Sequence, residues 1–301
     1  MFTSTVFNAL APSLAVTSAQ RVEQRRLRII LLAASSIFLL TTLAVILGWH
    51  RTDYFLLHSI NRFARRFFVL DYGIRTIERD MFSNLPLLTL VWYVWFKYTH
   101  VQVRAGILVG VLASFFAGVL SRGIQLTLPT HLRPLHDPAL HFQVPFGIDP
   151  DSLNHWSSFP SDHAAVLFGL AMTIFIVDRA AGWLAILCAT IVNLVRVYLG
   201  FHNPSDILCG AMLGIVLVLM TYGLRRRTPV LDLFQAFTRN RAVFYAVAFY
   251  TCFGIVTLFT DFRDTASGFL QGLHGRVPVP AISAHQGDEI IRGKRDLPRT
   301  R

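Results

Sequence analysis

The dominant pattern along the chain is a series of hydrophobic runs of about membrane-spanning length, separated by polar segments. An α-helix rises about 1.5 Å per residue, so about 20 apolar residues cross the hydrocarbon core of a bilayer. The runs predict an all-α, polytopic membrane protein with a six-helix transmembrane core and a seventh span near the C-terminus. The predicted spans are residues 29–49, 84–98, 105–121, 163–178, 181–199, 207–224 and 242–260.

The expected organisation of the chain follows from these runs. Residues 1–28 form a cytoplasmic N-terminal tail, and residues 29–224 form the six-span core, which contains a long loop at residues 122–162. Residues 225–301 comprise a basic loop, the seventh span and a polar tail. The run at residues 29–49 is too long for the hydrophobic region of a cleavable signal peptide, and no small-residue cleavage site follows it. It is therefore expected to remain as the first span.

The segment between the first two spans has a helical period of its own. Its apolar residues recur at spacings of three and four, which is typical of one helical face, and arginines occupy other positions. A helix over about residues 55–78 is predicted, bent or interrupted at Gly73. It either lies in the membrane interface or packs against the bundle. Its apolar face comprises Leu56, Ile60, Phe63, Phe67, Leu70, Ile74 and Ile77.

Composition and charge agree with a membrane protein. Charged residues make up 15% of the chain, whereas a soluble domain is usually about 25% charged. The net charge of +11 does not indicate a nucleic-acid partner, because no recognition motif accompanies it and basic flanks facing anionic lipid account for it. With the N-terminus in the cytoplasm, cytoplasmic segments hold twelve Lys and Arg residues against eight opposite, before the C-terminal tail is counted. This bias places residues 122–162 on the external side and leaves the side of the tail open.

Ionisable residues gather at the ends of the predicted spans, where charge is costly and therefore indicates function. One cluster lies in the long loop, the second begins the fourth span, and the third joins the fifth span to the sixth. All three fall on the same predicted external side. The clusters are Arg133-Pro134, then Pro160-Ser161-Asp162-His163, then Arg196 with His202 and Asp206.

These residue types in combination suit phosphoryl transfer. Guanidinium groups bind phosphate oxygens bidentately and stay charged, and a serine with the free amides of a helix start can complete the anion site. A histidine can attack phosphorus while a carboxylate four residues later, as in His202 and Asp206, fixes its tautomer. A second histidine can protonate the leaving oxygen.

The clusters resemble the motifs of the type-2 phosphatidic acid phosphatases, the lipid phosphate phosphatase family, over about residues 29–224. The resemblance implies hydrolysis of a lipid phosphate or pyrophosphate through a phosphohistidine, without metal or cofactor. It also implies a bacterial inner membrane protein whose active site faces the periplasm, with lipid phosphate and membrane lipids as its partners. The implied roles are phosphate binding for Arg133, Arg196 and Ser161, nucleophile for His202, its orienting partner for Asp206 and general acid for His163.

Three positions depart from the pattern of the family. Leu126 stands where the family has a lysine, which removes one phosphate-binding charge, and Arg122 or Gln125 are the candidates to replace it. Asp162 replaces a glycine, which resembles the polyprenyl pyrophosphate phosphatases of the family and favours undecaprenyl pyrophosphate as substrate. Val195 replaces the serine that precedes the second arginine.

Two other functions stay open at this point. A phosphotransferase would pass the phosphate from the phosphohistidine to a lipid or sugar hydroxyl instead of water. A non-catalytic lipid-binding or transport protein would use the same scaffold without chemistry, and the presence of both histidines, His163 and His202, argues against it.

The remaining histidines and cysteines are expected to be structural. His131, His136, His141 and His155 are scattered in the long loop, so they predict solvated polar side chains and no metal site. The cysteines are expected to be small packing residues inside the spans. They are Cys188, Cys209 and Cys252.

Overall fold

The computed structural model describes residues 18–153 and 156–256, and all regular secondary structure in these ranges is helical. This confirms the all-α expectation. Residues Met1–Cys252 form one compact unit, and the second unit, Phe253–Arg301, is described only over residues 253–256. The helices are α2 (Ser18–Ile46), α3 (Arg51–Asn61), α4 (Phe68–Glu78), α5 (Asp80–Lys97), α6 (Val101–Thr127), α7 (Asp162–Val177), α8 (Arg179–Tyr198), α9 (Pro204–Thr221), α10 (Thr228–Arg239) and α11 (Arg241–Val256), with short 3₁₀ turns η2 (Pro134–His136), η3 (Pro138–Leu140) and η4 (Tyr222–Arg226).

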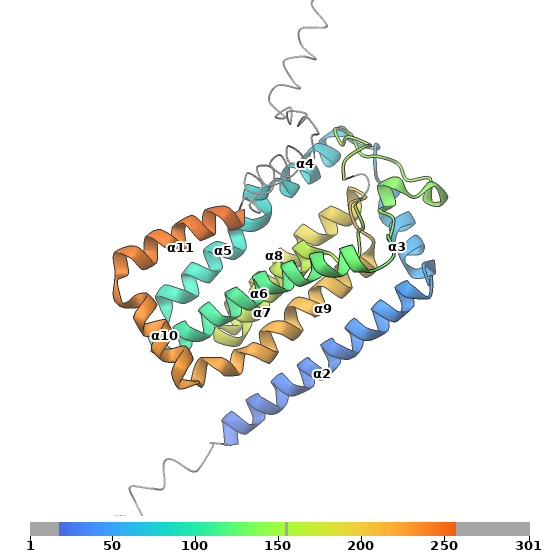
Figure 1. The fold of residues 1–301 in the computed structure, drawn as a ribbon. Coiled ribbons are helices and arrows are strands. Elements are labelled where there is room, and N and C mark those ends of the chain that lie inside the picture. Colours follow the sequence, from blue (N-terminus) through green and yellow to red (C-terminus); the bar gives the residue numbers. More distant parts are fainter. Residues whose placement is uncertain (1–17, 154–155, 257–301) are drawn as a thin grey trace, which may run out of the picture. The chain divides into compact units, whose positions relative to one another are not determined.

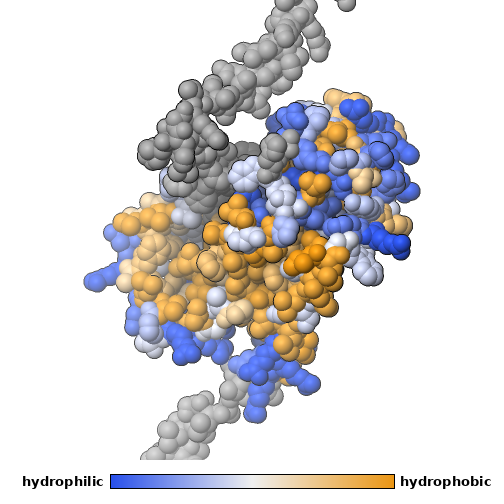
Figure 2. Space-filling view, turned by 45° about the vertical axis from the view of Figure 1, so that its right-hand side comes forward, coloured by the Kyte–Doolittle hydropathy of each residue, from blue (hydrophilic) through white to orange (hydrophobic). Residues whose placement is uncertain are grey.

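The seven hydrophobic runs are helical apart from residues 47–49, 98, 178 and 199 at their ends, and residues 257–260 of the last run lie outside the described ranges. Four described helices are long and apolar enough to cross a membrane, so the expected spans are confirmed in part. On the face in Figure 2, hydrophobic residues form a broad area with hydrophilic residues at its margins. The chain is an integral membrane protein. The four segments that are long and apolar enough to cross a membrane are Arg21–Ile46, Val101–Thr127, Arg179–Tyr198 and Pro204–Arg226.

Helix α7 is the centre of the helical core and packs against α6, α8 and α9 (Figure 1). It is apolar on every side, as expected for a helix that is buried all round. Leu170 and Ile174 are fully buried within the core cluster. Helix α2 covers α9, where Thr42 Oγ1 lies 3.3 Å from the Sγ atom of Cys209. The three cysteines are free thiols.

Two glycines bring α9 unusually close to the start of α7. A Cβ atom on Gly210 would lie 2.2 Å from the carbonyl oxygen of Ser161, and one on Gly214 would lie 2.1 Å from that of Ala165. Small residues of this kind let helix backbones approach closely inside a membrane. The backbone N–H of Ser161 also donates to the carbonyl oxygen of Asp206 at 3.0 Å. The first turns of α7 and α9 are thereby fixed side by side.

The helix predicted over residues 55–78 is in fact two helices, α3 and α4, and the interruption lies at residues 62–67 instead of Gly73. Arg65 adopts a positive φ of 60° there. The cause is tertiary, because the Asp71 carboxylate accepts hydrogen bonds from the N–H groups of Arg65 (3.0 Å) and Phe146 (2.9 Å) and from the Tyr198 hydroxyl. Helix α3 packs against the bundle through Leu57, which is buried beside Val197 of α8.

The basic segment after residue 225 is more ordered than the predicted loop. Residues Thr228–Arg239 form the amphipathic helix α10, which buries Phe234. Its aromatic contacts explain the difference, because Phe234 and Phe244 both pack on Trp95 of α5 with ring centroids 6.3 and 5.2 Å away. Packing of this apolar face stabilises a helix of 12 residues, which is too short to be stable in isolation.

We predict that Gly214→Ala lowers the thermal unfolding midpoint of the detergent-purified protein by several degrees. The added methyl would overlap the carbonyl of Ala165, and overpacking of this kind typically costs about 1–3 kcal/mol. Gly123→Ala is the matched control, because Gly123 is exposed on α6 with no atom within 4 Å of a new Cβ. Equal midpoints for the two variants would contradict the close approach of α9 to α7.

Candidate active site

The predicted site residues lie in the loop after α6, at the start of α7, and at the junction of α8 and α9, and these parts of the chain meet beside α3 (Figure 1). Five of them are buried, with exposed fractions between 0% and 6%, and the side chain of His163 is 13% exposed. Their charges act on one another across these four elements. The five buried residues are Arg133, Ser161, Arg196, His202 and Asp206.

His202 follows a tight turn after α8, where Gly200 has a φ of +79°. Its Nδ1 atom lies 3.1 Å from the carbonyl oxygen of Ser158. A carbonyl only accepts, so Nδ1 carries the proton and Nε2 keeps its lone pair. Burial lowers the pKa of His202 to about 4, and the charges of Arg133 and Arg196 act in the same direction. At neutral pH the imidazole is therefore uncharged, which is the nucleophilic form.

Asp206 lies closer to a second histidine than to His202. Its Oδ2 atom is 3.6 Å from His202 Nδ1 and accepts the Asn203 N–H at 2.7 Å. Its Oδ1 atom lies 3.0 Å from the Nδ1 atom of His131, which also lies 3.0 Å from Ser158 Oγ. The expectation that His131 is a solvated loop residue is wrong, because its side chain is only 13% exposed. Its position two residues before Arg133-Pro134 was the available sequence signal.

The other loop histidines are less closely tied to this cluster. His136 Nε2 lies 2.9 Å from the carbonyl oxygen of Ser152, and His141 ends η3 in a left-handed conformation. His155 lies outside the described residues. Within the described ranges, no three His, Cys, Asp or Glu side chains form a group suited to a metal ion.

The two arginines are held in different ways. The guanidinium of Arg133 donates to the carbonyl oxygens of Trp156 at 3.3 Å, Ser157 at 3.4 Å and Phe201. Burial lowers the pKa of Arg133 to about 10, so it stays charged at neutral pH. Arg196 Nη1 lies 3.5 Å from Glu78 Oε1, while its buried Nε–H has no hydrogen-bond acceptor among the described residues. An unsatisfied buried donor costs about 1–3 kcal/mol, and a phosphate oxygen would satisfy it.

The start of α7 supplies a capped helix end and an oriented histidine. Ser161 is the N-cap, and its Oγ atom accepts the N–H of Ala164 at 3.3 Å. Asp162 Oδ1 accepts the backbone N–H of His163 and pairs with His163 Nδ1, both at 2.9 Å. Asp162, which departs from the family pattern, therefore orients the imidazole of His163 through Nδ1.

Arg122 and Gln125 lie against the site, whereas the side chain of Leu126 is 76% exposed. Arg122 Nη1 donates to Gln125 Oε1 at 2.6 Å, and its guanidinium stacks 3.8 Å from the ring centre of Trp156. Gln125 Nε2 in turn donates to the carbonyl oxygen of Pro160 at 2.6 Å. The charge of Arg122 acts on Arg133, so a fixed cation borders the predicted phosphate site.

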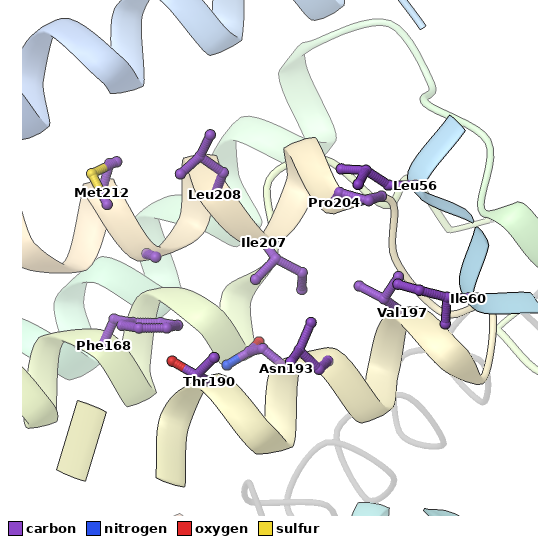
Figure 3. A pocket seen from close by; sticks show the side chains of 12 residues that line it. Leu56, Ile60, Phe168, Thr190, Asn193, Val197, Pro204, Ile207, Leu208 and Met212 are labelled. Carbon is purple, nitrogen blue, oxygen red and sulfur yellow. The ribbon is translucent and has the colours of Figure 1, made fainter. Parts of the chain in front are cut away.

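An apolar groove of about 340 Å³ lies between α8, α9 and α3 (Figure 3). It borders the site, because Val197 directly follows Arg196 and Pro204 comes two residues after His202. Thr190 and Asn193 are the polar members of its lining. The lining residues are Leu56, Ile60, Phe168, Thr190, Asn193, Leu194, Val197, Pro204, Ile207, Leu208, Ala211 and Met212.

Comparison with known proteins gives matches over the part of the chain that carries these clusters. Residues 107–229 match the sequence model of the PAP2 superfamily. Bacitracin transport permease protein BcrC of Bacillus licheniformis is 27% identical over 54% of this chain and 75% of its own length. Putative undecaprenyl-diphosphatase YbjG of Escherichia coli K12 is 30% identical over 46% of this chain, which spans 66% of the length of that protein. Lipid A 4'-phosphatase of Bacteroides thetaiotaomicron is 29% identical over 43% of this chain and 59% of its own length.

Among solved structures, the fold of a transmembrane PAP2-type phosphatidylglycerolphosphate phosphatase from Bacillus subtilis is similar, and the alignment covers 65% of this chain and 96% of the chain of that protein. Its TM-score is 0.45 and its sequence identity is 17%.

We predict that Arg122→Gln weakens binding of orthovanadate, a phosphate analogue, about tenfold. The substitution removes one charge-assisted contact, and a tenfold change in affinity corresponds to about 1.4 kcal/mol. Calorimetry on the detergent-purified protein measures the effect, with Arg66→Gln as the control because Arg66 is exposed in the turn between α3 and α4. If Arg122→Gln binds vanadate as tightly as the control, Arg122 does not replace the family's lysine.

Proposed function

We propose that this chain, which belongs to the PAP2 superfamily, cleaves its lipid substrate through a phosphohistidine formed on His202. Membership of this family makes it a lipid phosphatase. The observation that carries the mechanism is the buried imidazole of His202, whose Nδ1–H is held by the Ser158 carbonyl and whose Nε2 keeps its lone pair. No metal is needed to generate the nucleophile in this mechanism, because the attacking nitrogen is already uncharged at neutral pH.

In the first proposed step, Arg133 and Arg196 hold the phosphate and His202 Nε2 attacks phosphorus. A P–N bond forms while the P–O bond to the leaving group breaks, and His163 gives its Nε2 proton to the departing oxygen. Asp162 orients His163 for this role through Nδ1. The positive charge that develops on His202 is stabilised by the Ser158 carbonyl and by Asp206, 3.6 Å away.

In the second proposed step, water cleaves the P–N bond. His163, now neutral, accepts a proton from the attacking water, and His202 leaves as the uncharged imidazole. Inorganic phosphate is released and both histidines return to their starting states. A lipid or sugar hydroxyl in place of water would make the same intermediate a phosphotransferase, so release of inorganic phosphate separates the two functions.

The substrate we favour is undecaprenyl pyrophosphate. Two of the relatives carry the name undecaprenyl-diphosphatase, YbjG of Escherichia coli and BcrC of Bacillus subtilis. Asp162 adds a carboxylate beside His163, as in the polyprenyl pyrophosphate phosphatases that the sequence resembles. The groove between α8 and α9 is apolar and borders His202, so it suits the hydrocarbon chain of such a lipid.

The membrane arrangement we propose is a six-helix core of α2 and α5–α9, with α11 as a seventh span. Helix α7 is short at 16 residues, about 24 Å, but it lies inside the bundle, where its neighbours shield it from lipid. The excess of Lys and Arg in the predicted cytoplasmic segments, counted without the C-terminal tail, favours an active site on the periplasmic side of a bacterial inner membrane.

We predict that His202→Ala lowers the rate of phosphate release from undecaprenyl pyrophosphate by at least about a thousandfold. It removes the nucleophile, whereas Asp206→Asn keeps it and should retain measurable activity. The assay measures inorganic phosphate released by the detergent-purified protein in excess EDTA. The control is His136→Ala, which removes a histidine of the long loop that has no role in the proposed mechanism. Wild-type release by His202→Ala would leave a phosphohistidine untenable, and inhibition by EDTA that magnesium reverses would refute metal independence.

We also predict that Met212→Trp raises the KM for a long-chain lipid phosphate severalfold without changing turnover of a short-chain, water-soluble ester. Met212 lines the groove at the end away from Pro204 (Figure 3), so a larger side chain would obstruct a hydrocarbon chain there. Met220→Trp is the matched control, because Met220 lies on the same helix, is 64% exposed and is outside the groove. Equal KM values for the two variants would show that the chain binds elsewhere.

A further inference from the structure

The carboxylate of Asp206 faces a histidine through each of its oxygens. Oδ1 lies 3.0 Å from His131 Nδ1, and Oδ2 lies 3.6 Å from His202 Nδ1. Asp206 itself is fully buried. A buried carboxylate that lacks a compensating cation is costly, and it draws protons towards any base beside it. Which of the two histidines holds the positive charge therefore decides whether His202 can act as a nucleophile.

We propose that His131 is a positioning residue whose imidazolium neutralises Asp206 and so keeps His202 uncharged and ready to attack. This inference rests on the proposed function, because it assigns the protonation state of the nucleophile in that mechanism. The geometry favours His131 as the cation, since its hydrogen-bond distance to the carboxylate is shorter by 0.6 Å than the distance from His202.

The surroundings of His131 favour the charged form. Burial acts against it, but the hydrogen bond and charge of Asp206, with Asp53 on α3 and Asp137 before η3, raise the pKa of His131 above its usual value. The ring of His50 stacks on the His131 ring at 5.3 Å. The charges of three carboxylates on three separate segments thus act on one imidazole, and Asp206 is the one in contact with it.

The surroundings of His202 favour the neutral form. Arg133 from the long loop and Arg196 from α8 oppose a positive charge on it, while Asp206 and Asp162 act in the opposite direction. Its Nδ1–H is directed at the Ser158 carbonyl, so the proton that it carries is already satisfied. Ser158 also places its hydroxyl 3.0 Å from His131 Nδ1, and one residue therefore orients both rings.

Asp53 ties α3 to the same arrangement. Its Oδ1 atom accepts the Ser205 N–H at 2.9 Å, and its Oδ2 atom accepts the Ser205 hydroxyl at 2.6 Å. These bonds hold the first turn of α9, and with it Asp206, against the segment that carries His50. The position of the carboxylate between the two histidines is therefore fixed from two sides.

The test is the pH dependence of kcat/KM for His131→Ala and His131→Gln, measured on one soluble phosphate substrate so that the ionisation of the substrate is common to all curves. Without the cation, Asp206 raises the pKa of His202, and the acidic limb of the profile should move to higher pH by about one unit or more. His131→Gln retains an N–H donor but no charge, so it should show the same displacement. His136→Ala should keep the wild-type profile.

An acidic limb that stays at its wild-type position in both variants, with only a lower rate, would overturn the proposal and leave His131 a structural residue. Recovery of the wild-type limb in His131→Gln alone would show that the hydrogen bond matters and the charge does not, which also overturns it. A measurement without a loss-of-fold risk is ¹⁵N NMR of histidine-labelled wild-type protein, which should show two imidazoliums above pH 7, that of His131 and that of the general acid His163. Absence of the His131 imidazolium would overturn the proposal. Activity retained by His202→Ala would instead refute the proposed function itself.

Discussion

The active site depends on one fully buried residue, Asp206, through both its backbone and its side chain. The backbone carbonyl accepts the N–H of Ser161 and joins the first turns of α9 and α7. The carboxylate accepts the N–H of Asn203, which caps α9, and faces His131 and His202. The desolvation free energy of this buried carboxylate is offset only because each of its oxygens has a hydrogen-bond donor or a cation beside it. The same residue therefore joins the two helices and, in the mechanism we propose, controls the protonation of the nucleophile.

Sequence reasoning predicted the helices and the gathering of the candidate site residues at one end of the bundle, because both depend on local patterns. Hydrophobic runs of membrane-spanning length form helices wherever the backbone must satisfy its own hydrogen bonds, and motifs at span ends fall together when the helices pack. The interruption between α3 and α4 was missed because Asp71 fixes it through Phe146 and Tyr198, which are distant in sequence. Helix α10 was missed for a similar reason, since its apolar face is stabilised by Trp95.

The partner of Asp206 shows the limit of spacing arguments. An i, i+4 separation predicts that Asp206 reaches His202, and the 3.6 Å distance agrees with proximity but exceeds a hydrogen bond. The nearer histidine, His131, is 75 residues away in sequence and reaches the carboxylate only through the folded loop. Polar residues scattered in a long loop resemble solvated side chains in the sequence, and only their burial distinguishes them.

The missing lysine illustrates how a charge can be supplied from a different backbone position. Leu126 directs its side chain away from the bundle, whereas Arg122 lies one helical turn earlier on α6 and is held by Gln125 and by the ring of Trp156. Trp156 also accepts a hydrogen bond from Arg133 through its carbonyl, so one loop residue positions two guanidiniums. A planar guanidinium fixed by stacking loses little side-chain entropy when it binds an oxyanion. If Arg122 takes the place of the family's lysine, as we propose, the exchange conserves the charge and adds orientation.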